Sequence, residues 1–173
     1  MEERATFAGG CFWCIEHAFT DLPGVTKAVS GYAGGDEKTA TYMQVATRRT
    51  AHKEAVQITF DPAAISYEQL LDVFWKNIDP TDEGGQFADR GPEYMTEIMY
   101  HNDAQRDVAE ASKKALDKSG VFDAPIVTTI VPFTTFFEAE EEHQGYAKKC
   151  PIAYNRYAKG SGRKDFIEQT WKK

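Results

Sequence analysis

The sequence lacks a long apolar run, a basic excess and a large set of cysteines. No segment reaches the roughly 18 consecutive apolar residues that predict a membrane-spanning helix. The formal net charge is -7, whereas proteins that bind nucleic acid normally carry a basic face. The charged N-terminus lacks the apolar core of a secretion signal. We therefore expect a cytoplasmic protein whose partners include neither nucleic acid nor a membrane.

The chain has three cysteines, Cys11, Cys14 and Cys150. A secreted disulfide framework uses more cysteines, and an even number of them. An odd count with two cysteines close together instead indicates redox or metal chemistry in a reducing compartment. The length of 173 residues suits one compact domain, so we expect residues 1–173 to form a single catalytic domain. Nothing in the sequence requires more than a monomer.

Apolar periodicity and turn residues predict alternating strands and helices. The expected strands cover residues 4–8, 25–32, 54–60, 97–100 and 126–131, and the expected helices cover 12–20, the segment after Ser66, 103–119 and 138–149. Ser66 and Gln69 have the spacing of a helix capping box. We predict an α/β (α+β) protein, a two-layer sandwich with a mixed β-sheet and an irregular C-terminal tail. Periodicity alone does not establish the order of the strands.

The segment GGCFWC at residues 9–14 is the main chemical signal. A strand ends, two glycines turn the chain, and Cys11 follows at the start of a helix. Free backbone N–H groups there favour a negative charge, so we expect the pKa of Cys11 to be lowered and its thiolate to be a good nucleophile. Cys14 lies three residues later on nearly the same helix face, where the pair can close a disulfide.

Other interpretations of the cysteines stay open at this point. Both could be buried structural residues, with Phe12 and Trp13 as ordinary core side chains. A zinc site would need Cys150 and one of the four histidines, His17, His52, His101 or His143, although no second ligand pair has metal spacing. A general C-x-x-C thiol–disulfide oxidoreductase is a third possibility. We expect no metal and no cofactor.

Several segments in order resemble the type A methionine sulfoxide reductases. They are GCFWC (10–14), SGYAGG (30–35), Thr41-Tyr42, His52 with Glu54, DPAAISYEQLL (61–71), Phe74-Trp75, Asp79-Pro80-Thr81, the run 86–94 and EEHQ (141–144). The resemblance covers about residues 6–144, with a looser tail to Trp171. It implies a ferredoxin-like plait core and an enzyme that reduces the S epimer of methionine sulfoxide, free or in oxidised proteins, in the repair of oxidative damage.

The resemblance also implies roles for individual residues. Cys11 matches the nucleophile that attacks the sulfoxide sulfur and becomes a sulfenic acid. Glu54 matches the acid, which must be protonated near neutral pH, so burial should raise its pKa. Tyr42 and Tyr94 match phenols that donate to the sulfoxide oxygen, and Asp89 matches a carboxylate that holds the water network of the site.

Two further features follow from the same comparison. Phe12 and Trp13 match the pocket for the substrate methyl group. Cys14 is the expected first resolving cysteine, and Cys150 is a candidate for a second disulfide that passes oxidation to the surface, where thioredoxin or a similar dithiol reduces it. Many members place a cysteine near the position of Asn155 instead, and this chain does not.

This chain departs from the family pattern around three of these residues. It has Ala51-His52-Lys53-Glu54, Gln86-Phe87-Ala88-Asp89 and Gly91-Pro92-Glu93-Tyr94-Met95-Thr96 where Gly-His-Ala-Glu, Gln-Gly-Asn-Asp and Gly-Thr-Gln-Tyr-Arg-Ser are common. The residue types of Glu54, Asp89 and Tyr94 are kept. These changes bear on rate and substrate preference.

One alternative function belongs to a different class, that of a non-enzymatic protein that binds oxidised or apolar peptides. This alternative predicts an inert Cys11.

Overall fold

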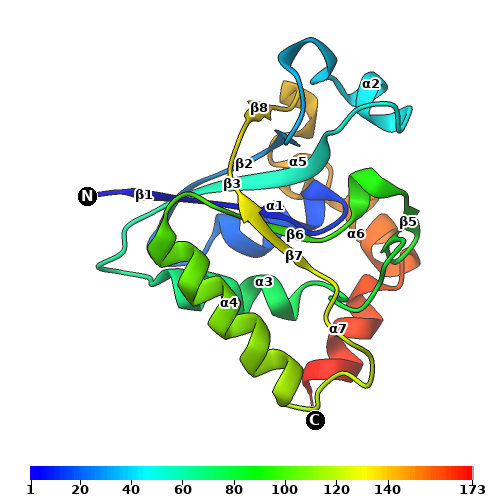
Figure 1. The fold of residues 1–173 in the computed structure, drawn as a ribbon. Coiled ribbons are helices and arrows are strands. Elements are labelled where there is room, and N and C mark those ends of the chain that lie inside the picture. The colour runs from blue at the N-terminus through cyan, green and yellow to red at the C-terminus, as the bar shows by residue number, and fades with distance from the viewer. Residues whose placement is uncertain (173) are drawn as a thin grey trace.

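A six-stranded sheet in the order β7-β6-β1-β3-β2-β8 forms the centre of the computed structural model, which describes residues 1–172 (Figure 1). Its strands are β1 (Glu3–Ala8), β2 (Val25–Ala33), β3 (Lys53–Phe60), β6 (Glu97–Tyr100), β7 (Thr129–Pro132) and β8 (Phe136–Glu138). The helices are α1 (Phe12–Thr20), α2 (Tyr42–Ala46), α3 (Tyr67–Lys76), α4 (Asp103–Lys118), α5 (Tyr146–Lys149), α6 (Pro151–Gly160) and α7 (Arg163–Trp171). A two-stranded hairpin, β4 (Gly85–Gln86) with β5 (Asp89–Arg90), and three 3₁₀ turns, η1 (Glu37–Thr39), η2 (Pro92–Tyr94) and η3 (Glu141–His143), complete the list.

The predicted fold class is confirmed. Strands β6-β1-β3-β2 pair antiparallel, and α1 and α3 make the crossovers, which is the ferredoxin-like plait. At the two edges, β7 pairs parallel with β6 and β8 pairs antiparallel with β2, so the whole sheet is mixed. Figure 1 shows α3 and α4 along one face of this sheet. Within residues 1–172, no helix combines the length and the apolar character that crossing a membrane requires.

The core lies between the sheet and the helices. Phe7 of β1 has its ring centroid 4.9 Å from that of Phe74 of α3 and 5.7 Å from that of Phe19 of α1. Val56 and Ile58 of β3 lie opposite β1 in the ladder and are fully buried on the same face. Burying several aromatic rings together stabilises the junction of β1 and α1.

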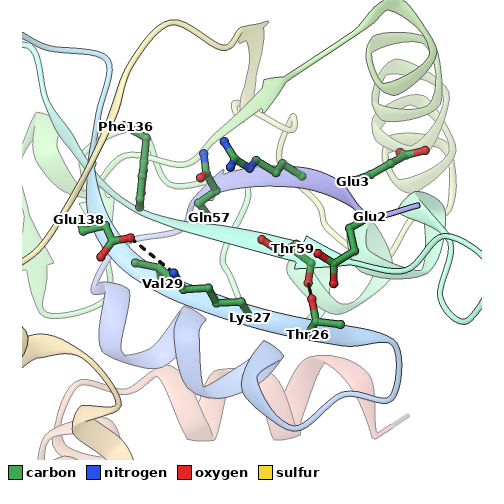
Figure 2. A pocket seen from close by; sticks show the side chains of 10 residues that line it. Glu2, Glu3, Thr26, Lys27, Val29, Gln57, Thr59, Phe136 and Glu138 are labelled. Carbon is green, nitrogen blue, oxygen red and sulfur yellow. Dashed lines mark hydrogen bonds and ion pairs between the residues drawn. The ribbon is translucent and has the colours of Figure 1, made fainter.

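The opposite face of the sheet has a polar hollow of about 400 Å³, shown in Figure 2. Lys27 and Glu138 form an ion pair across it at 3.6 Å, but both side chains are more than 60% exposed, so the pair adds little stability. None of the ten residues that line the hollow is a cysteine or a histidine. The hollow is therefore separate from the cysteine chemistry.

The predicted irregular C-terminal tail is wrong, because the tail forms α5, α6 and α7. Pro151 occupies the first turn of α6, where its missing N–H costs nothing, and Gly162 at φ 89° separates α6 from α7. Tyr154 is buried against the two N-terminal cysteines. Only a short stripe of α6, formed by Tyr154, Tyr157 and Ala158, packs on the cysteines, so tertiary packing supplies most of the stability of this helix.

Two further boundaries differ from the sequence prediction. The last long strand begins at Thr129 rather than 126, because the backbone N–H of Val127 donates to Pro80 of the loop after α3 at 2.7 Å. The helix predicted for 138–149 is replaced by β8, η3 and the short α5. Phe136–Glu138 pairs with β2 instead, and Gly145 at φ 61° interrupts the backbone before α5.

The capping box of α3 gives a prediction about stability. The Ser66 hydroxyl accepts from the Gln69 N–H at 3.1 Å, and the Gln69 side chain accepts from the Ser66 N–H at 2.9 Å. Ser66→Ala should lower the free energy of unfolding by about 1 kcal/mol, because a first-turn donor loses its partner. Urea denaturation measures this. Thr134→Ala at an exposed position is the control, and equal stability of both variants would contradict the prediction.

Candidate active site

The turn between β1 and α1 places Cys11 as the N-cap residue of α1. Gly10 has φ 85°, and a Cβ built there would lie 2.6 Å from Cβ of Gln86 and 2.8 Å from Nη2 of Arg163. Only glycine combines this backbone conformation with such close neighbours. The chain can therefore turn sharply beneath the hairpin β4–β5 and the start of α7.

Cys11 and Cys14 are both buried, with 6% and 5% of their surface exposed, and their thiols share a hydrogen bond. All three cysteines are free thiols. Burial raises the pKa of Cys11 well above its usual range. The pKa of Cys14 is lowered to about 7, chiefly by the hydrogen bond with Cys11 and then by the charge of Arg163, against the effect of burial.

The expectation that the helix N-terminus lowers the pKa of Cys11 is wrong for this state of the protein. The side chain of Cys11 makes no capping hydrogen bond, and the nearby N–H of Phe12 donates to Glu54 instead. Removal from water disfavours a thiolate more than the partial charge of the helix end favours it. The negative charge of the pair is therefore held by Cys14.

Glu54 lies on β3 directly beside this helix start. It is 4% exposed, and its Oε1 accepts the Phe12 N–H at 3.3 Å. Burial raises the pKa of Glu54 to about 8, although the bonds from Phe12 and the Tyr94 hydroxyl lower it in part. The carboxyl is thus protonated at neutral pH, which is the direction that the sequence analysis required.

The other polar residues of the predicted site also gather here. Tyr94, the last residue of η2, hydrogen-bonds Glu54, and burial raises its pKa, so its phenol keeps the proton. Tyr42, at the start of α2, is 36% exposed, and its pKa is raised by burial and then by the charges of Glu54 and Cys11. Asp89 on β5 accepts a hydrogen bond from the Tyr157 hydroxyl.

The two aromatic residues between the cysteines, Phe12 and Trp13, lie in different environments. Phe12 is 1% exposed and packs against Tyr32 and His143, with ring centroids 5.7 and 5.3 Å away. Trp13 is partly exposed, donates to Nδ1 of His143 at 3.2 Å, and stacks on Tyr146 at 3.8 Å. Together they make an apolar wall next to Cys11, with Trp13 on its accessible side.

Cys150 lies apart from the buried pair. It is exposed at the junction of α5 and α6, in a shallow hollow that also contains Ile152, itself 78% exposed. A zinc site of all three cysteines would need Cys150 near Cys11 and Cys14. In the described part of the chain, the one group of three potential metal ligands is Glu140, Glu142 and His143, which contains no cysteine.

Three residues of the C-terminal tail belong to the site although no motif in the sequence predicted them. Tyr157 of α6 hydrogen-bonds Cys11 as well as Asp89, and Tyr154 hydrogen-bonds Cys14. Their spacing of three residues places them on one face of a helix, and this was the only available signal. These two phenols cover the thiols of Cys11 and Cys14.

Arg163, also missed, connects α7 to the cysteine turn. It is 4% exposed, and its guanidinium donates to the carbonyl oxygens of Gly9 at 3.0 Å and Asn77 at 2.5 Å. It lies 4.8 Å from the ring centroid of Phe87 as a cation–π contact. No pattern in the sequence pointed to it, because a single arginine after a glycine is usually a surface residue.

The chain is similar to known proteins over nearly its full length. Residues 3–173 match the family described as peptide methionine sulfoxide reductase. The chain is 55% identical over 170 residues to peptide methionine sulfoxide reductase MsrA of Bacillus subtilis, covering 98% of this chain and 96% of that one. It is 51% identical to MsrA 2 of Staphylococcus aureus over 170 residues, with the same coverage.

Solved structures agree with the sequence comparison. Reduced Mxr1 of Saccharomyces cerevisiae is similar with a TM-score of 0.81 at 30% identity, and the likeness covers 87% of each chain. Methionine sulfoxide reductase A of Corynebacterium diphtheriae is similar with a TM-score of 0.76 at 29% identity, covering 87% of this chain and 76% of that one. The family resemblance found in the sequence is thus confirmed over nearly the full length.

The electrostatics of the thiol pair can be tested by titration. In a Cys150→Ser background, thiolate absorbance should show a first midpoint near pH 7. Arg163→Met should raise that midpoint by about one unit, equivalent to about 1.4 kcal/mol, because a neighbouring positive charge is lost. Arg163→Lys keeps the charge and should retain most of the lowering. Arg156→Met on the exposed side of α6 is the control, and an equal shift in that variant would refute the role of Arg163.

Proposed function

The chain belongs to the peptide methionine sulfoxide reductase family and is therefore an oxidoreductase, and we propose that Cys11 reduces the S epimer of methionine sulfoxide, free or in oxidised proteins. The observation that carries this proposal is the position of the Cys11 thiol beside a protonated, buried carboxyl, Glu54, and a second thiol, Cys14. A nucleophile, an acid and a resolving group are the three parts that the reaction needs. The family also supports a repair role after oxidative damage.

The first step activates the sulfoxide. Its sulfur is a poor electrophile until the oxygen is protonated or strongly hydrogen-bonded. Glu54 supplies the proton, because its carboxyl is neutral below pH 8. The phenols of Tyr42 and Tyr94 donate to the same oxygen, and Asp89 holds the water that surrounds it. Donors that are already oriented stabilise the developing charge without reorganisation.

The second step transfers oxygen to the enzyme. The Cys11 thiol passes its proton to the Cys14 thiolate across their shared hydrogen bond, and the Cys11 thiolate attacks the sulfoxide sulfur. The sulfur–oxygen bond of the substrate breaks as the protonated oxygen passes to Cys11, the new sulfur–sulfur bond opens, methionine leaves, and Cys11 becomes a sulfenic acid. Phe12 and Trp13 bound the space for the substrate methyl group, which selects one epimer at sulfur. Since Cys11 is only 6% exposed, the Tyr157 side chain gives way when substrate enters.

The third step resolves the sulfenic acid. Cys14 attacks the Cys11 sulfur, the sulfur–oxygen bond breaks, and the oxygen takes up the proton that Cys14 gives up and leaves as water. A pKa of about 7 keeps a large share of Cys14 as thiolate at neutral pH, and its shared hydrogen bond with Cys11 places it within reach. Thioredoxin or a similar dithiol then reduces the disulfide, and the exposed Cys150 can carry oxidation to the surface.

Replacement of the nucleophile tests this proposal. Cys11→Ser should form no methionine from the S epimer in a single turnover, because a hydroxyl is a far weaker nucleophile than a thiolate. Cys150→Ser is the matched control, since one turnover needs no recycling, and it should form one methionine per protein. Chromatographic quantification of methionine measures both. Full activity of Cys11→Ser would end the assignment.

The acid can be tested through the pH dependence of the same chemical step. The wild-type single-turnover rate should fall as the pH rises through about 8, because Glu54 then loses the proton that it donates. Glu54→Gln should be slower by about a hundredfold or more, as expected when a general acid is lost, and should lack this alkaline fall. Glu16→Gln, at another buried carboxyl, is the control. An unchanged profile in Glu54→Gln would remove Glu54 from the role.

A further inference from the structure

A second cavity, of about 290 Å³, opens onto Cys14 from between α1, α6 and α7. Cys14 forms part of its wall, together with His17 of α1, Asn155 of α6 and Arg163 and Lys164 of α7, whereas Cys11 is not among its lining residues. The cavity therefore gives access to one sulfur of the pair only. Its size suits a small molecule.

The charges around this cavity favour an anion. Arg163 is buried, its guanidinium bonds only to backbone carbonyls, and its Nε has no partner within residues 1–172. Lys164 is exposed at the rim. The one carboxylate in the lining, Glu168, pairs with Lys172 at 3.5 Å, which offsets its charge. In the oxidised protein Cys14 carries no negative charge, so the buried Arg163 loses that charge as a partner and attracts a negatively charged ligand strongly.

We propose that this cavity binds a low-molecular-weight thiol that carries a carboxylate, and that its thiolate attacks Cys14 of the oxidised protein. Cys14 at the wall provides the sulfur, and Arg163 and Lys164 provide the charge that holds the carboxylate. The inference rests on the proposed function only in that the protein then forms a Cys11–Cys14 disulfide. It adds a route of reduction that does not need a protein partner.

The chemistry balances with two thiols. The first thiolate forms a bond to Sγ of Cys14, the Cys11–Cys14 bond breaks, and its electron pair leaves on Sγ of Cys11, which takes up a proton. A second thiolate attacks the small-molecule sulfur of the mixed disulfide and releases the Cys14 thiolate. Two thiols are oxidised to one disulfide, and the protein gains two electrons.

Two opposing effects determine which sulfur of the Cys11–Cys14 disulfide the small-molecule thiolate attacks. The Cys14 thiolate is the more stable leaving group, and on that ground alone a thiol would attack Cys11. Cys11, however, is covered by Tyr157 on α6, whereas Cys14 borders the cavity. Because attack requires contact between the sulfurs, access decides, and the mixed disulfide forms on Cys14.

The test uses full-length Cys150→Ser protein in which diamide has closed the Cys11–Cys14 disulfide, so that it does not depend on sulfoxide turnover. Mercaptoacetate, 2-mercaptoethanol and 2-aminoethanethiol carry negative, zero and positive charge. Their rates of reduction are each divided by the rate on an uncharged reference disulfide at low ionic strength. Mercaptoacetate should exceed 2-aminoethanethiol by about tenfold, as expected for charges held near one another at a protein surface.

Three variants test whether the dependence of the reduction rate on thiol charge arises at this cavity. Lys164→Glu should lower the mercaptoacetate rate by about tenfold and change the 2-mercaptoethanol rate less than about twofold. Lys114→Glu on α4 makes the same change in net charge outside the cavity and should leave all rates unchanged. Asn155→Trp at the rim should slow all three thiols. Acid quenching and mass spectrometry should find the adduct on Cys14.

The outcomes separate the two proposals. An adduct on Cys11, or equal effects of Lys164→Glu and Lys114→Glu, would overturn the cavity as the thiol site. Methionine formation from sulfoxide, measured separately on the same protein, reports on the proposed function alone. A protein that forms methionine but shows no charge ranking refutes only this inference, and one that shows the ranking without forming methionine refutes only the proposed function.

Discussion

The hydrogen bond from the Phe12 N–H to the Glu54 carboxyl joins the start of α1 to β3, and the rest of the site is arranged around it. The first amides of a helix have no partner within the helix, and a buried carboxyl needs donors. One contact satisfies both requirements and brings the acid beside Cys11. Burial still outweighs the two bonds that Glu54 accepts, so its pKa reaches about 8 and the carboxyl stays neutral. A charged carboxylate there would instead oppose a thiolate on Cys11.

The C-terminal helices determine which thiol carries the charge. By covering Cys11 with Tyr157, α6 removes this thiol from water, and the benefit of a helix N-terminus for a thiolate is lost. Arg163 of α7 acts in the opposite direction on Cys14, since its guanidinium is anchored on the carbonyls of Gly9 and Asn77 close to that sulfur. With Cys11 covered, the negative charge therefore lies on Cys14, for which we propose the resolving role.

The sequence predicted the parts of this arrangement that local patterns encode. The α1 helix starts and ends at the predicted residues, and the strand with alternating apolar positions at 54–60 places Glu54 on the helical face of the sheet. The capping box of Ser66 was likewise visible, because it depends on two residues three apart. The family resemblance supplied the roles that spacing could not.

What the sequence could not predict depends on contacts between distant segments. Arg163 contacts Gly9 across more than 150 positions, and Tyr157 reaches Asp89 across 68, so no window along the chain contains either pair. The raised pKa of Cys11 has the same origin, because it arises first from burial, and the groups that lie against this thiol include Glu54 and Tyr157, which are distant in the sequence. The expected irregular tail and the expected acidic Cys11 were wrong for this one reason.

The central claim is that the buried Cys11–Cys14 pair, next to neutral Glu54, reduces one epimer of methionine sulfoxide. The most direct measurement is a single turnover of the wild-type protein with each epimer separately, without reductant, followed by mass spectrometry of the cysteine-containing peptides. The account predicts one methionine per protein from the S epimer, none from the R epimer, and a new Cys11–Cys14 disulfide. Absence of methionine from both epimers, with Cys11 and Cys14 still reduced, would contradict it.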